Sequence, residues 1–330
     1  MRNFTFKGLL LTAVFMLLGC LSIQAANDDL ITKQITINLD KAGTLPDRIA
    51  SSKKYKITNL KIVGEINGTD WNMIREMAGR NYQESSTEGN LSVLDLSEAK
   101  IVAGGDYYYD DNLFNNKVYT SNDEIGEYAF AYCSGLTSLT LPVGITSIGE
   151  FAFSGCSGLT SLTLPAGITS IGEYAFYGCS GLTSLTLPAG ITSIGSRAFY
   201  GCSGFTSLTL PAGITSIGEF AFSYCSGLTS IYVYAEKVPR IGRYAFEGCA
   251  SRKCTLYVPK GTYDNYRLSE FGYFENIVEF DATGIDKTTT STDVEEVSRY
   301  SLNGQRLAVP VKGLNIVKYS DGTARKVVVK

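Results

Sequence analysis

The middle of the chain repeats one pattern of apolar and polar positions. Leucines recur with the spacing Leu-x-x-Leu-x-Leu, as at Leu159, Leu162 and Leu164, and serine and threonine stand between them. Successive side chains of a strand point to opposite faces, so Leu162 and Leu164 are predicted to be buried and Ser161 and Thr163 exposed. Each copy therefore predicts one short strand with an apolar face and a hydroxyl face.

The copies follow one another at a regular interval. They begin every 23 residues, with a diverged copy at the end, at Tyr128, Phe151, Tyr174, Arg197, Phe220 and Tyr244. A repeat of 20 to 30 residues with this leucine spacing is typical of a leucine-rich repeat solenoid, in which each unit buries its apolar side chains only against its neighbours. We call each turn of the predicted solenoid a rung.

The rest of the unit predicts how each rung closes. A proline follows each strand and would end its hydrogen-bond ladder, and the next glycine would permit a turn; these are Pro142, Pro165, Pro188 and Pro211, with Gly144, Gly167, Gly190 and Gly213. Ile168 and Ile171 supply a second apolar pair. Ala175, Phe176 and Cys179 complete the predicted core in a short helical or irregular turn.

Outside the clean copies the pattern changes, which divides the chain into five segments. We predict a signal peptide (1–26), an N-terminal cap with the first rungs (27–90), the solenoid with its C-terminal cap (91–281), a threonine-rich linker (282–297) and a small β module (298–330). The first cap contains a predicted helix over Trp71–Met77. The dipeptides Asn303-Gly304 and Asp321-Gly322 are hairpin signals in the last segment.

The N-terminus has the features of an export signal. Arg2 and Lys7 precede the short apolar run "LLLTAVFMLL", and small residues follow it. Cleavage after Ala25 or Ala26 would leave a free N-terminus. Alternatively, "LLGC" resembles a lipobox, in which case Cys20 would be lipidated and would supply the chain's membrane contact.

Two stretches resemble known bacterial families. The unit "IGEYAFYGCSGLTSLTLPAGITS", the leader "GEINGTDWNMIREMAG" and the closing "LYVPKGTYDNY" resemble the BspA-like leucine-rich repeat proteins of bacterial surfaces. The tail "KGLNIVKYSDGTARKVVVK" resembles, more weakly, the sorting modules of type IX secretion. These resemblances imply a secreted or outer-surface protein with an adhesive or protein-binding role.

Composition excludes several kinds of chemistry. The chain has no histidine, so Ser-His and Cys-His catalysis cannot operate. Its formal net charge is −3, without the basic stripe that nucleic acid requires. The acids Glu150, Glu173 and Glu219 recur at one repeat position, but Ser196 replaces them in another copy. We therefore expect solvated surface groups there, and no enzyme, cofactor or metal site.

The cysteines recur with the repeat. They stand at Cys133, Cys156, Cys179, Cys202 and Cys225, then one residue late at Cys249, and Cys254 follows. Equivalent positions on stacked rungs lie about 4.8 Å apart with parallel Cβ vectors, which suits a disulfide poorly. We expect a buried column of free thiols, with a Cys249–Cys254 bridge as the alternative.

Exposed hydroxyl and aromatic side chains are the candidate binding residues. The hydroxyl face comprises Ser161, Thr163, Ser184, Thr186, Ser207 and Thr209, and the aromatic candidates are Tyr232 and Tyr234 on the last full strand and Tyr107, Tyr108 and Tyr109 in an expected loop, "GGDYYYDDN". Long loops and exposed tyrosines commonly make contacts. We expect a monomer that binds an extracellular protein or glycan, the alternative being a purely structural spacer.

Overall fold

The computed structural model describes residues 29–111, 116–282, 296–301, 306–307, 313–319 and 324–329. The expected signal peptide with Cys20, most of the expected linker and the two C-terminal turn dipeptides lie outside these residues. Within them, no helix has the length and apolar character needed to cross a bilayer.

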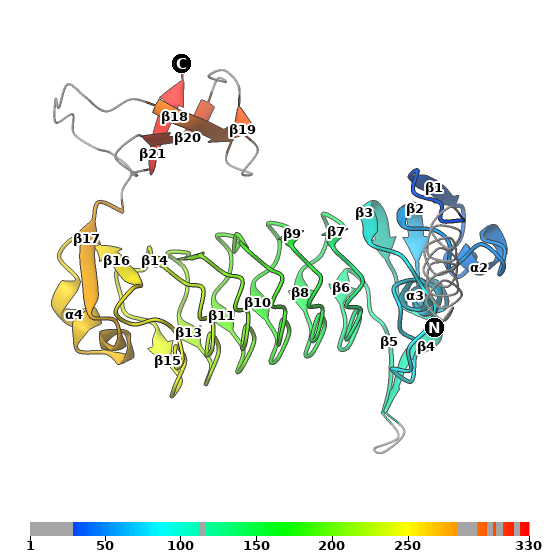
Figure 1. Cartoon of the computed structure of the whole chain (residues 1–330), viewed down its shortest axis with the longest axis horizontal. Helices are drawn as coiled ribbons and strands as arrows, with labels where there is room; N and C mark the ends of the chain where they lie inside the picture. The colour runs from blue at the N-terminus through cyan, green and yellow to red at the C-terminus, as the bar shows by residue number, and fades with distance from the viewer. Residues whose placement is uncertain are drawn as a thin grey trace, which may run out of the picture.

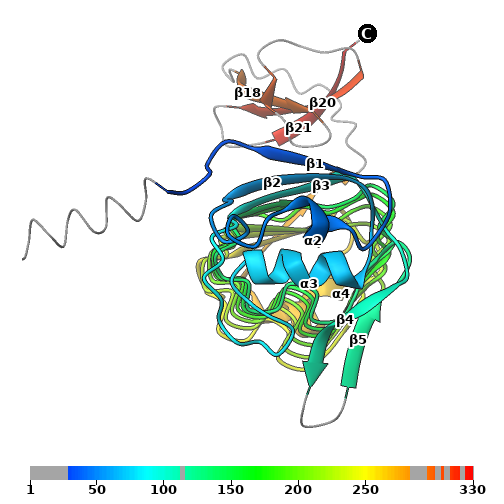
Figure 2. The same ribbon diagram turned by 90° about the vertical axis from the view of Figure 1, so that its right-hand side faces the viewer.

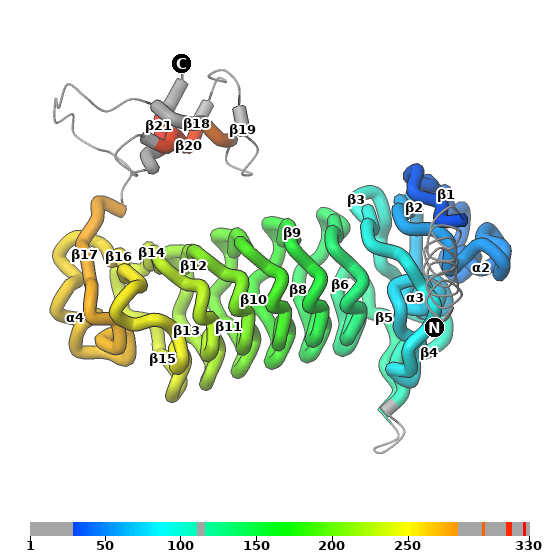
Figure 3. The backbone as a smooth tube through the Cα atoms, in the orientation of Figure 1, coloured from blue at the N-terminus to red at the C-terminus, as the bar shows by residue number. Residues whose placement is uncertain are grey.

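The repeats stack into a solenoid, one turn of chain per repeat (Figures 1 and 3). One line of strands pairs in parallel, in register from Ser138 to Ser161 and from Ser207 to Ser230. Isolated bridges at Ser184 and Thr186 join its two halves. The line comprises β1 (Ile35–Leu39), β2 (Asn59–Ile66), β3 (Val93–Ile101), β7 (Ser138–Thr140), β9 (Ser161–Thr163), β12 (Ser207–Leu210), β14 (Ser230–Val233), β16 (Thr255–Pro259) and β17 (Asn276–Phe280).

The sequence did not predict a second parallel line of two-residue strands, each of which ends in isoleucine. The members of this line are β6 (Glu124–Ile125), β8 (Ser147–Ile148), β10 (Ser170–Ile171), β11 (Ser193–Ile194), β13 (Ser216–Ile217) and β15 (Arg240–Ile241). Four of them are Ser-Ile pairs, whereas β6 is Glu-Ile and β15 is Arg-Ile. The isoleucines of these pairs face the core, as expected for Ile171, which is 2% exposed. Two residues are too few to show an alternating pattern, so the sequence carries no strand signal there.

The third side of each rung is an irregular turn without helix, held by bonds to the next rung. The amides of Phe151, Phe153 and Gly155 donate to the carbonyls of Glu173, Ala175 and Tyr177 at 3.0, 2.7 and 2.7 Å. The turn begins in the left-handed region at non-glycine residues: φ is +55°, +52°, +53°, +54°, +55° and +58° at Tyr128, Phe151, Tyr174, Arg197, Phe220 and Tyr244. Such a conformation costs of order 1 kcal/mol per residue, which the bonds between rungs offset.

The glycines after the prolines do not have the role predicted for them. Gly144, Gly167, Gly190 and Gly213 are absent from the positive-φ positions, so no left-handed turn requires them. A different glycine is required, because a Cβ on Gly172 would lie 2.7 Å from the carbonyl carbon of Gly149 on the preceding rung. Close approach of two backbones therefore selects glycine in this column.

The solenoid core is a set of columns that run along the stack. The phenylalanine rings of Phe130, Phe153, Phe176, Phe199, Phe222 and Phe246 follow one another at centroid separations of 5.0 to 5.5 Å. Leu162 and Leu164 are each 6% exposed, which confirms the predicted alternation. Rings stacked in this way bury large apolar areas and stabilise every interface between rungs.

The N-terminal cap closes one end of the stack. Its helix α3 (Gly68–Met77), predicted around Trp71–Met77, lies across the end of the coil beside α2 (Leu45–Arg48) (Figure 2). The Trp71 indole N–H donates to the carbonyl of Ala129 at 2.9 Å, and its ring packs 5.1 Å from that of Phe130. The strand β1 and helix α2 were not predicted, since "ITINL" and "LPDR" are short and match no repeat.

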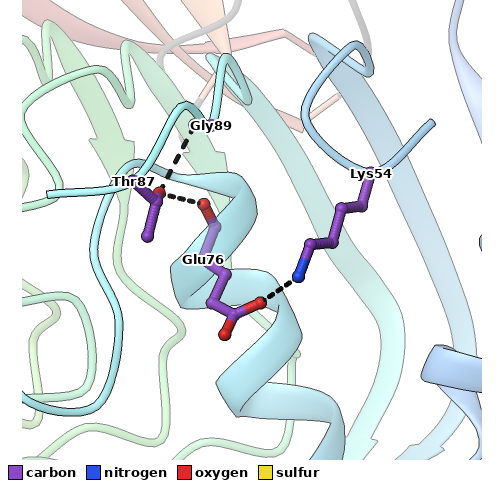
Figure 4. Close-up of polar contacts among 4 residues, drawn as sticks. All are labelled: Lys54, Glu76, Thr87 and Gly89. Carbon is purple, nitrogen blue, oxygen red and sulfur yellow. Dashed lines mark hydrogen bonds and ion pairs between the residues drawn. The ribbon is translucent and has the colours of Figure 1, made fainter. Parts of the chain in front are cut away.

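Polar contacts hold the loops of this cap to α3. The Glu76 carboxylate pairs with Lys54, and its main-chain carbonyl accepts from the hydroxyl of Thr87 (Figure 4). The Thr87 hydroxyl accepts in turn from the Gly89 amide at 3.4 Å. At the other end of α3, the buried Asp70 accepts from the amides of Asn67 and Leu45 at 2.9 and 2.8 Å. These bonds satisfy main-chain groups that the turns leave unpaired.

The C-terminal cap covers the opposite end. The helix α4 (Tyr263–Arg267) and the 3-10 helix η1 (Glu270–Tyr273) connect β16 to β17. Phe271 and Phe274 pack 5.3 and 5.2 Å from Phe246, the last ring of the phenylalanine column. Residues beyond 295 contain a separate antiparallel sheet in the order β19-β18-β20-β21, made of β18 (Glu296–Ser301), β19 (Arg306–Leu307), β20 (Gly313–Tyr319) and β21 (Ala324–Val329).

Candidate functional site

The expected "YYYDD" loop is a strand, so that prediction was wrong. The segment Gly104–Asp111 forms β4, which pairs with β5 (Asn116–Thr120) as an antiparallel hairpin projecting beside the stack (Figure 2). Tyr108 and Tyr109 are 1% and 7% exposed. Aromatic residues favour paired strands, and the segment inserted before the regular repeats forms the two strands of this hairpin.

Two of the three tyrosines of β4, Tyr108 and Tyr109, attach the hairpin to the first rung. The Tyr108 hydroxyl donates to the carbonyl of Glu127 at 2.8 Å, and burial raises the pKa of Tyr108 well above its usual value. Tyr109 stacks on Tyr128 at 4.0 Å. The half-buried Tyr107 has the ammonium of Lys117 over its ring at 4.3 Å.

The hydroxyl face is assembled as an ordered array. Six exposed side chains stand in two columns across three rungs, because their strands pair without a register shift: Ser161, Thr163, Ser184, Thr186, Ser207 and Thr209. Neighbouring rungs are about 4.8 Å apart. Some hydroxyls bond to a neighbouring rung: that of Thr160, just before the face, donates to the Thr137 carbonyl at 3.0 Å, and that of Ser207 accepts from the Ser230 hydroxyl at 3.1 Å.

The aromatic candidates on the last full strand form a cluster at the C-terminal end of the hydroxyl face. The half-buried Tyr232 stacks on Tyr257 at 4.4 Å, and the Phe280 ring meets Tyr232 and Tyr234 edge-on at 6.0 and 5.1 Å. Burial raises the pKa of both Tyr232 and Tyr234. The rings therefore pack against one another across β14, β16 and β17.

A second aromatic surface lies on the turn side of the solenoid. The first residue of each turn contributes to a column that we call the ring column: Tyr128, Phe151, Tyr174, Arg197, Phe220 and Tyr244. Tyr128, Phe151 and Tyr174 stack at 4.9 and 4.5 Å. The Arg197 guanidinium takes a ring's place, 5.4 Å from the Tyr174 centroid and 4.8 Å from that of Phe220.

A groove runs beside the ring column. Its volume is about 420 Å³, and it is lined by Tyr132, Phe151, Ser154, Tyr174, Tyr177, Arg197, Tyr200 and Phe220. Tyr177 and Tyr200 stack at 5.0 Å, and the Tyr177 ring lies 5.8 Å from that of Tyr174 in the ring column. Tyr132 and Tyr177 are 43% and 37% exposed, so they present ring surface to solvent. Tyrosine and arginine in a groove are typical of binding surfaces.

The sequence did not predict the ring column or the exposed Tyr177 and the half-buried Tyr200 beside it. The signal was present in the alignment of the repeats, because the first turn position is aromatic in all copies but one. That position lies in the left-handed region, which large aromatic residues rarely adopt. Because neighbouring rings stack at this position, we expect their contacts to offset part of the strain.

The acids that recur with the repeat adjoin the ring column. Glu127, Glu150, Glu173 and Glu219 are exposed and each precedes a ring-column residue, while Ser196 and Arg243 stand at this position in the other copies. Partial burial, together with the neighbouring carboxylates of Glu127 and Glu173, raises the pKa of Glu150. The carboxylates of Glu127, Glu150 and Glu173 thus lie on consecutive rungs, and the outer two disfavour the charged form of Glu150.

The cysteine column has a specific structural role. All seven cysteines from Cys133 to Cys254 are buried free thiols, which confirms the thiol column and makes the alternative Cys249–Cys254 bridge wrong. The Cys179 thiol donates to the Phe153 carbonyl of the preceding rung at 3.1 Å. The same bond recurs from Cys156, Cys202, Cys225 and Cys249 to Phe130, Phe176, Phe199 and Phe222 at 3.0 to 3.2 Å.

Within the part of the chain that the structure describes, no three cysteine or acidic side chains are grouped so as to hold a metal ion. Burial raises the pKa of the thiols, to about 12 for Cys179, so they remain protonated and poor as nucleophiles. The described surface therefore presents rings, hydroxyls and carboxylates to solvent, whereas its thiols are buried.

The solenoid is similar to solved bacterial structures. A T. pallidum leucine-rich repeat protein matches at 30% identity and a TM-score of 0.39, over 42% of this chain and 63% of that one. A leucine-rich cell surface protein from Faecalibacterium prausnitzii matches at 22% and 0.31, over 63% and 49%. The pneumococcal vaccine antigen PcpA matches at 15% and 0.41, over 75% and 68%.

The match with the T. pallidum protein thus spans less than two thirds of that protein's length. A search of curated proteins found no match. The family model for the BspA-type leucine-rich repeat region matches this chain in six copies. The matches cover residues 123–253 and 196–306, which together exceed half of the chain. With the stacked rungs and their periodic core, this match shows that the chain belongs to the BspA-type leucine-rich repeat family.

Proposed function

We propose that this protein is a non-catalytic binding protein, exported to the bacterial surface, that holds an extracellular protein or glycan on its solenoid. The observation that carries the proposal is the groove beside the ring column, which is lined by tyrosines from several rungs and by one arginine, with Tyr132 and Tyr177 exposed. Tyrosine and arginine dominate binding energy in protein interfaces. Equivalent contacts on successive rungs would add, so weak contacts can give a strong overall affinity.

Export is supported by the signal-like N-terminus, and the surface location by family membership. The lack of histidine and the protonated thiols support a role without catalysis. A purely structural spacer is the competing function, and the near-identity of the copies favours it, because a dedicated binding face usually differs from rung to rung.

The two functions are separated by a binding screen. The protein spanning 27–330 is applied to arrays of extracellular matrix proteins and glycans beside a variant lacking 151–196, which removes two whole repeats and rejoins equivalent positions. Circular dichroism and the unfolding temperature establish that the short variant is folded. Saturable binding by the full protein that weakens by about tenfold or more in the short variant supports the proposal. The absence of binding by both forms supports the spacer.

A further inference from the structure

One rung of the solenoid departs from the repeat at two adjacent positions. On the rungs to either side, an exposed glutamate, Glu173 or Glu219, directly precedes an aromatic residue of the ring column. In the rung between them, Ser196 takes the place of the glutamate and Arg197 takes the place of the ring. This rung therefore lacks a negative charge and carries a positive charge, in a stack whose copies are otherwise nearly identical.

The guanidinium of Arg197 is held in position, yet most of its donors are unused. It lies between the rings of Tyr174 and Phe220, and its Nη1 donates to the Tyr174 hydroxyl at 2.8 Å. Among the residues that the structure describes, its other N–H groups have no hydrogen-bond partner, and no carboxylate forms an ion pair with it. The planar donors of arginine match the oxygens of a carboxylate or a phosphate-like group. A fixed guanidinium with free donors therefore suits an anionic ligand.

General charge attraction would not bring an anion to this place. The formal net charge of the chain is −3, and Glu173 and Glu219 are exposed on the neighbouring rungs. An anion that binds here must therefore contact Arg197 directly, because the surrounding charge opposes it.

The groove around Arg197 is compact. The rings of Tyr174 and Tyr177 lie 5.8 Å apart, so the ring column and the pair Tyr177 and Tyr200 touch at this point and leave no continuous channel along the stack. The groove has a volume of about 420 Å³. The main chain of an extended peptide would need an open channel, whereas a single sugar ring that bears a charged group fits a short site.

Tyrosine supplies the surface that would contact such a sugar. Tyr177 is exposed and Tyr200 is half-buried, and both line the groove with Arg197. Within the described part of the chain, neither tyrosine hydroxyl has a hydrogen-bond partner. A tyrosine ring offers an apolar face to the C–H groups of a sugar, and its hydroxyl can donate to or accept from a sugar hydroxyl.

We infer that Arg197 and the tyrosines around it bind an acidic sugar of an extracellular glycan. The guanidinium pairs with the carboxylate or sulfate group of the sugar, and Tyr177 and Tyr200 contact the sugar ring. The inference rests on the proposed binding function and assigns it a site and a ligand class. An acidic segment of a protein is the competing outcome.

The test uses the protein spanning 27–330 and four ligands of similar length. A heparin hexasaccharide carries sulfates and carboxylates, a hyaluronan hexasaccharide carries carboxylates alone, maltohexaose carries no charge, and hexaglutamate carries charge without sugar. Isothermal titration calorimetry measures the dissociation constants at about 0.15 M salt, where attraction between distant exposed charges is largely screened.

Four variants separate the contributions of charge, geometry and rings. Arg197→Tyr removes the cation and restores the kind of residue that the neighbouring rungs carry, and Arg197→Lys keeps the charge without the planar donors. Tyr177→Ser with Tyr200→Ser introduces the residue that Ser154 provides at this position of a neighbouring repeat. The control, Arg240→Gln, removes an exposed arginine from the second line of strands. Circular dichroism establishes that each variant is folded.

We expect at least one of the two acidic hexasaccharides to bind, and neither maltohexaose nor hexaglutamate to bind. Arg197→Tyr should weaken binding by about tenfold or more and Arg197→Lys by about fivefold. The double tyrosine variant should weaken it by about tenfold, and Arg240→Gln by less than about twofold. Equal losses in Arg240→Gln and Arg197→Tyr would indicate general charge attraction and overturn the inference. Failure of both acidic hexasaccharides to bind, or equally tight binding of hexaglutamate, would also overturn it.

The same variants are applied to the array of the binding screen. If the intact protein binds a macromolecule there and Arg197→Tyr binds it equally well, the proposed function stands and the inference fails. If Arg197→Tyr loses binding to proteins alone, the proposed function stands and the ligand class is wrong. If the intact protein binds nothing on the array and none of the four ligands, both proposals fail.

Discussion

The guanidinium of Arg197 donates a 2.8 Å hydrogen bond to the hydroxyl of Tyr174, the residue that occupies the same repeat position one rung earlier. It also lies 5.4 Å from the centroid of that ring. A charged side chain thus continues a column that is otherwise aromatic. This relationship is specific to one interface between rungs, and the contribution of that interface to stability is measurable.

Replacing Arg197 tests the ring column. Arg197→Ala removes the contacts with Tyr174 and Phe220 and should lower the free energy of unfolding by about 0.5–2 kcal/mol. Arg197→Tyr restores the ring found in other copies and should be neutral or stabilising. Urea unfolding followed by circular dichroism measures both. A loss in Arg197→Tyr as large as in Arg197→Ala would show that the ring column does not stabilise the stack.

The close approach of neighbouring turns predicts opposite effects at two glycines. Gly172→Ala should destabilise by about 1–3 kcal/mol, because the new Cβ would lie 2.7 Å from the main chain of Gly149. Gly190→Ala is the matched control: its Cβ would meet its nearest neighbour at an ordinary 3.5 Å and should stabilise by up to about 1 kcal/mol. Unfolding temperatures of the two variants should move in opposite directions, and equal losses would contradict the observed spacing.

The buried thiols predict a loss of stability at alkaline pH. Burial raises the pKa of Cys179 from 9.0 to about 12, so the unfolded chain loses this proton first as the pH rises. The contribution of Cys179 to the free energy of unfolding is complete below pH 9. It falls by about 1.4 kcal/mol per pH unit from there up to the pKa of the folded state. Urea midpoints at pH 7, 9 and 10 measure the slope, and Cys179→Ala should make it shallower. An unchanged slope in that variant would show that the thiol does not contribute.

The same burial predicts that the thiols are unreactive in the folded protein. A thiol reagent at pH 8 should modify none of the seven described cysteines until the protein unfolds, because all are buried. The absorbance of the leaving group of a chromogenic thiol reagent measures the reaction, and a urea-unfolded sample is the control. Rapid modification of even one thiol under native conditions would mean that part of the column is open to solvent.

The raised pKa of Glu150 predicts that its charge destabilises the folded protein at neutral pH. Its pKa is raised above the model-compound value of 4.5 by burial and by the carboxylates of Glu127 and Glu173. The folded protein therefore binds the Glu150 proton more tightly than the unfolded chain does. The contribution of Glu150 to folding is favourable below pH 4.5 and is lost as the pH rises through the pKa of the folded state. Comparing Glu150→Gln with the unaltered protein should show a gain in unfolding temperature at pH 7 that disappears near pH 4. A gain that persists at pH 4 would exclude this origin.

The sequence by itself determined the repeating core. Leu162 and Leu164 could be assigned inward and Ser161 and Thr163 outward, because the two-residue period of a strand is a local property. The thiol column followed from the same reasoning, since Cys156 and Cys179 recur at one repeat position and stacked rungs keep their Cβ vectors parallel. The helix around Trp71 was predictable from a run long enough to show its type.

Only the tertiary structure decided which outward residues meet. Tyr108 was expected at a surface and is buried, because the hairpin packs onto the first rung through the Glu127 carbonyl. Arg197 and Tyr177 line one groove because hydrogen bonds between neighbouring turns, such as that from the Tyr174 amide to the Ser196 carbonyl, stack these turns in register. Periodicity places side chains on a face of one rung, whereas distances between rungs depend on turn conformation and on the approach of backbones that no single repeat contains.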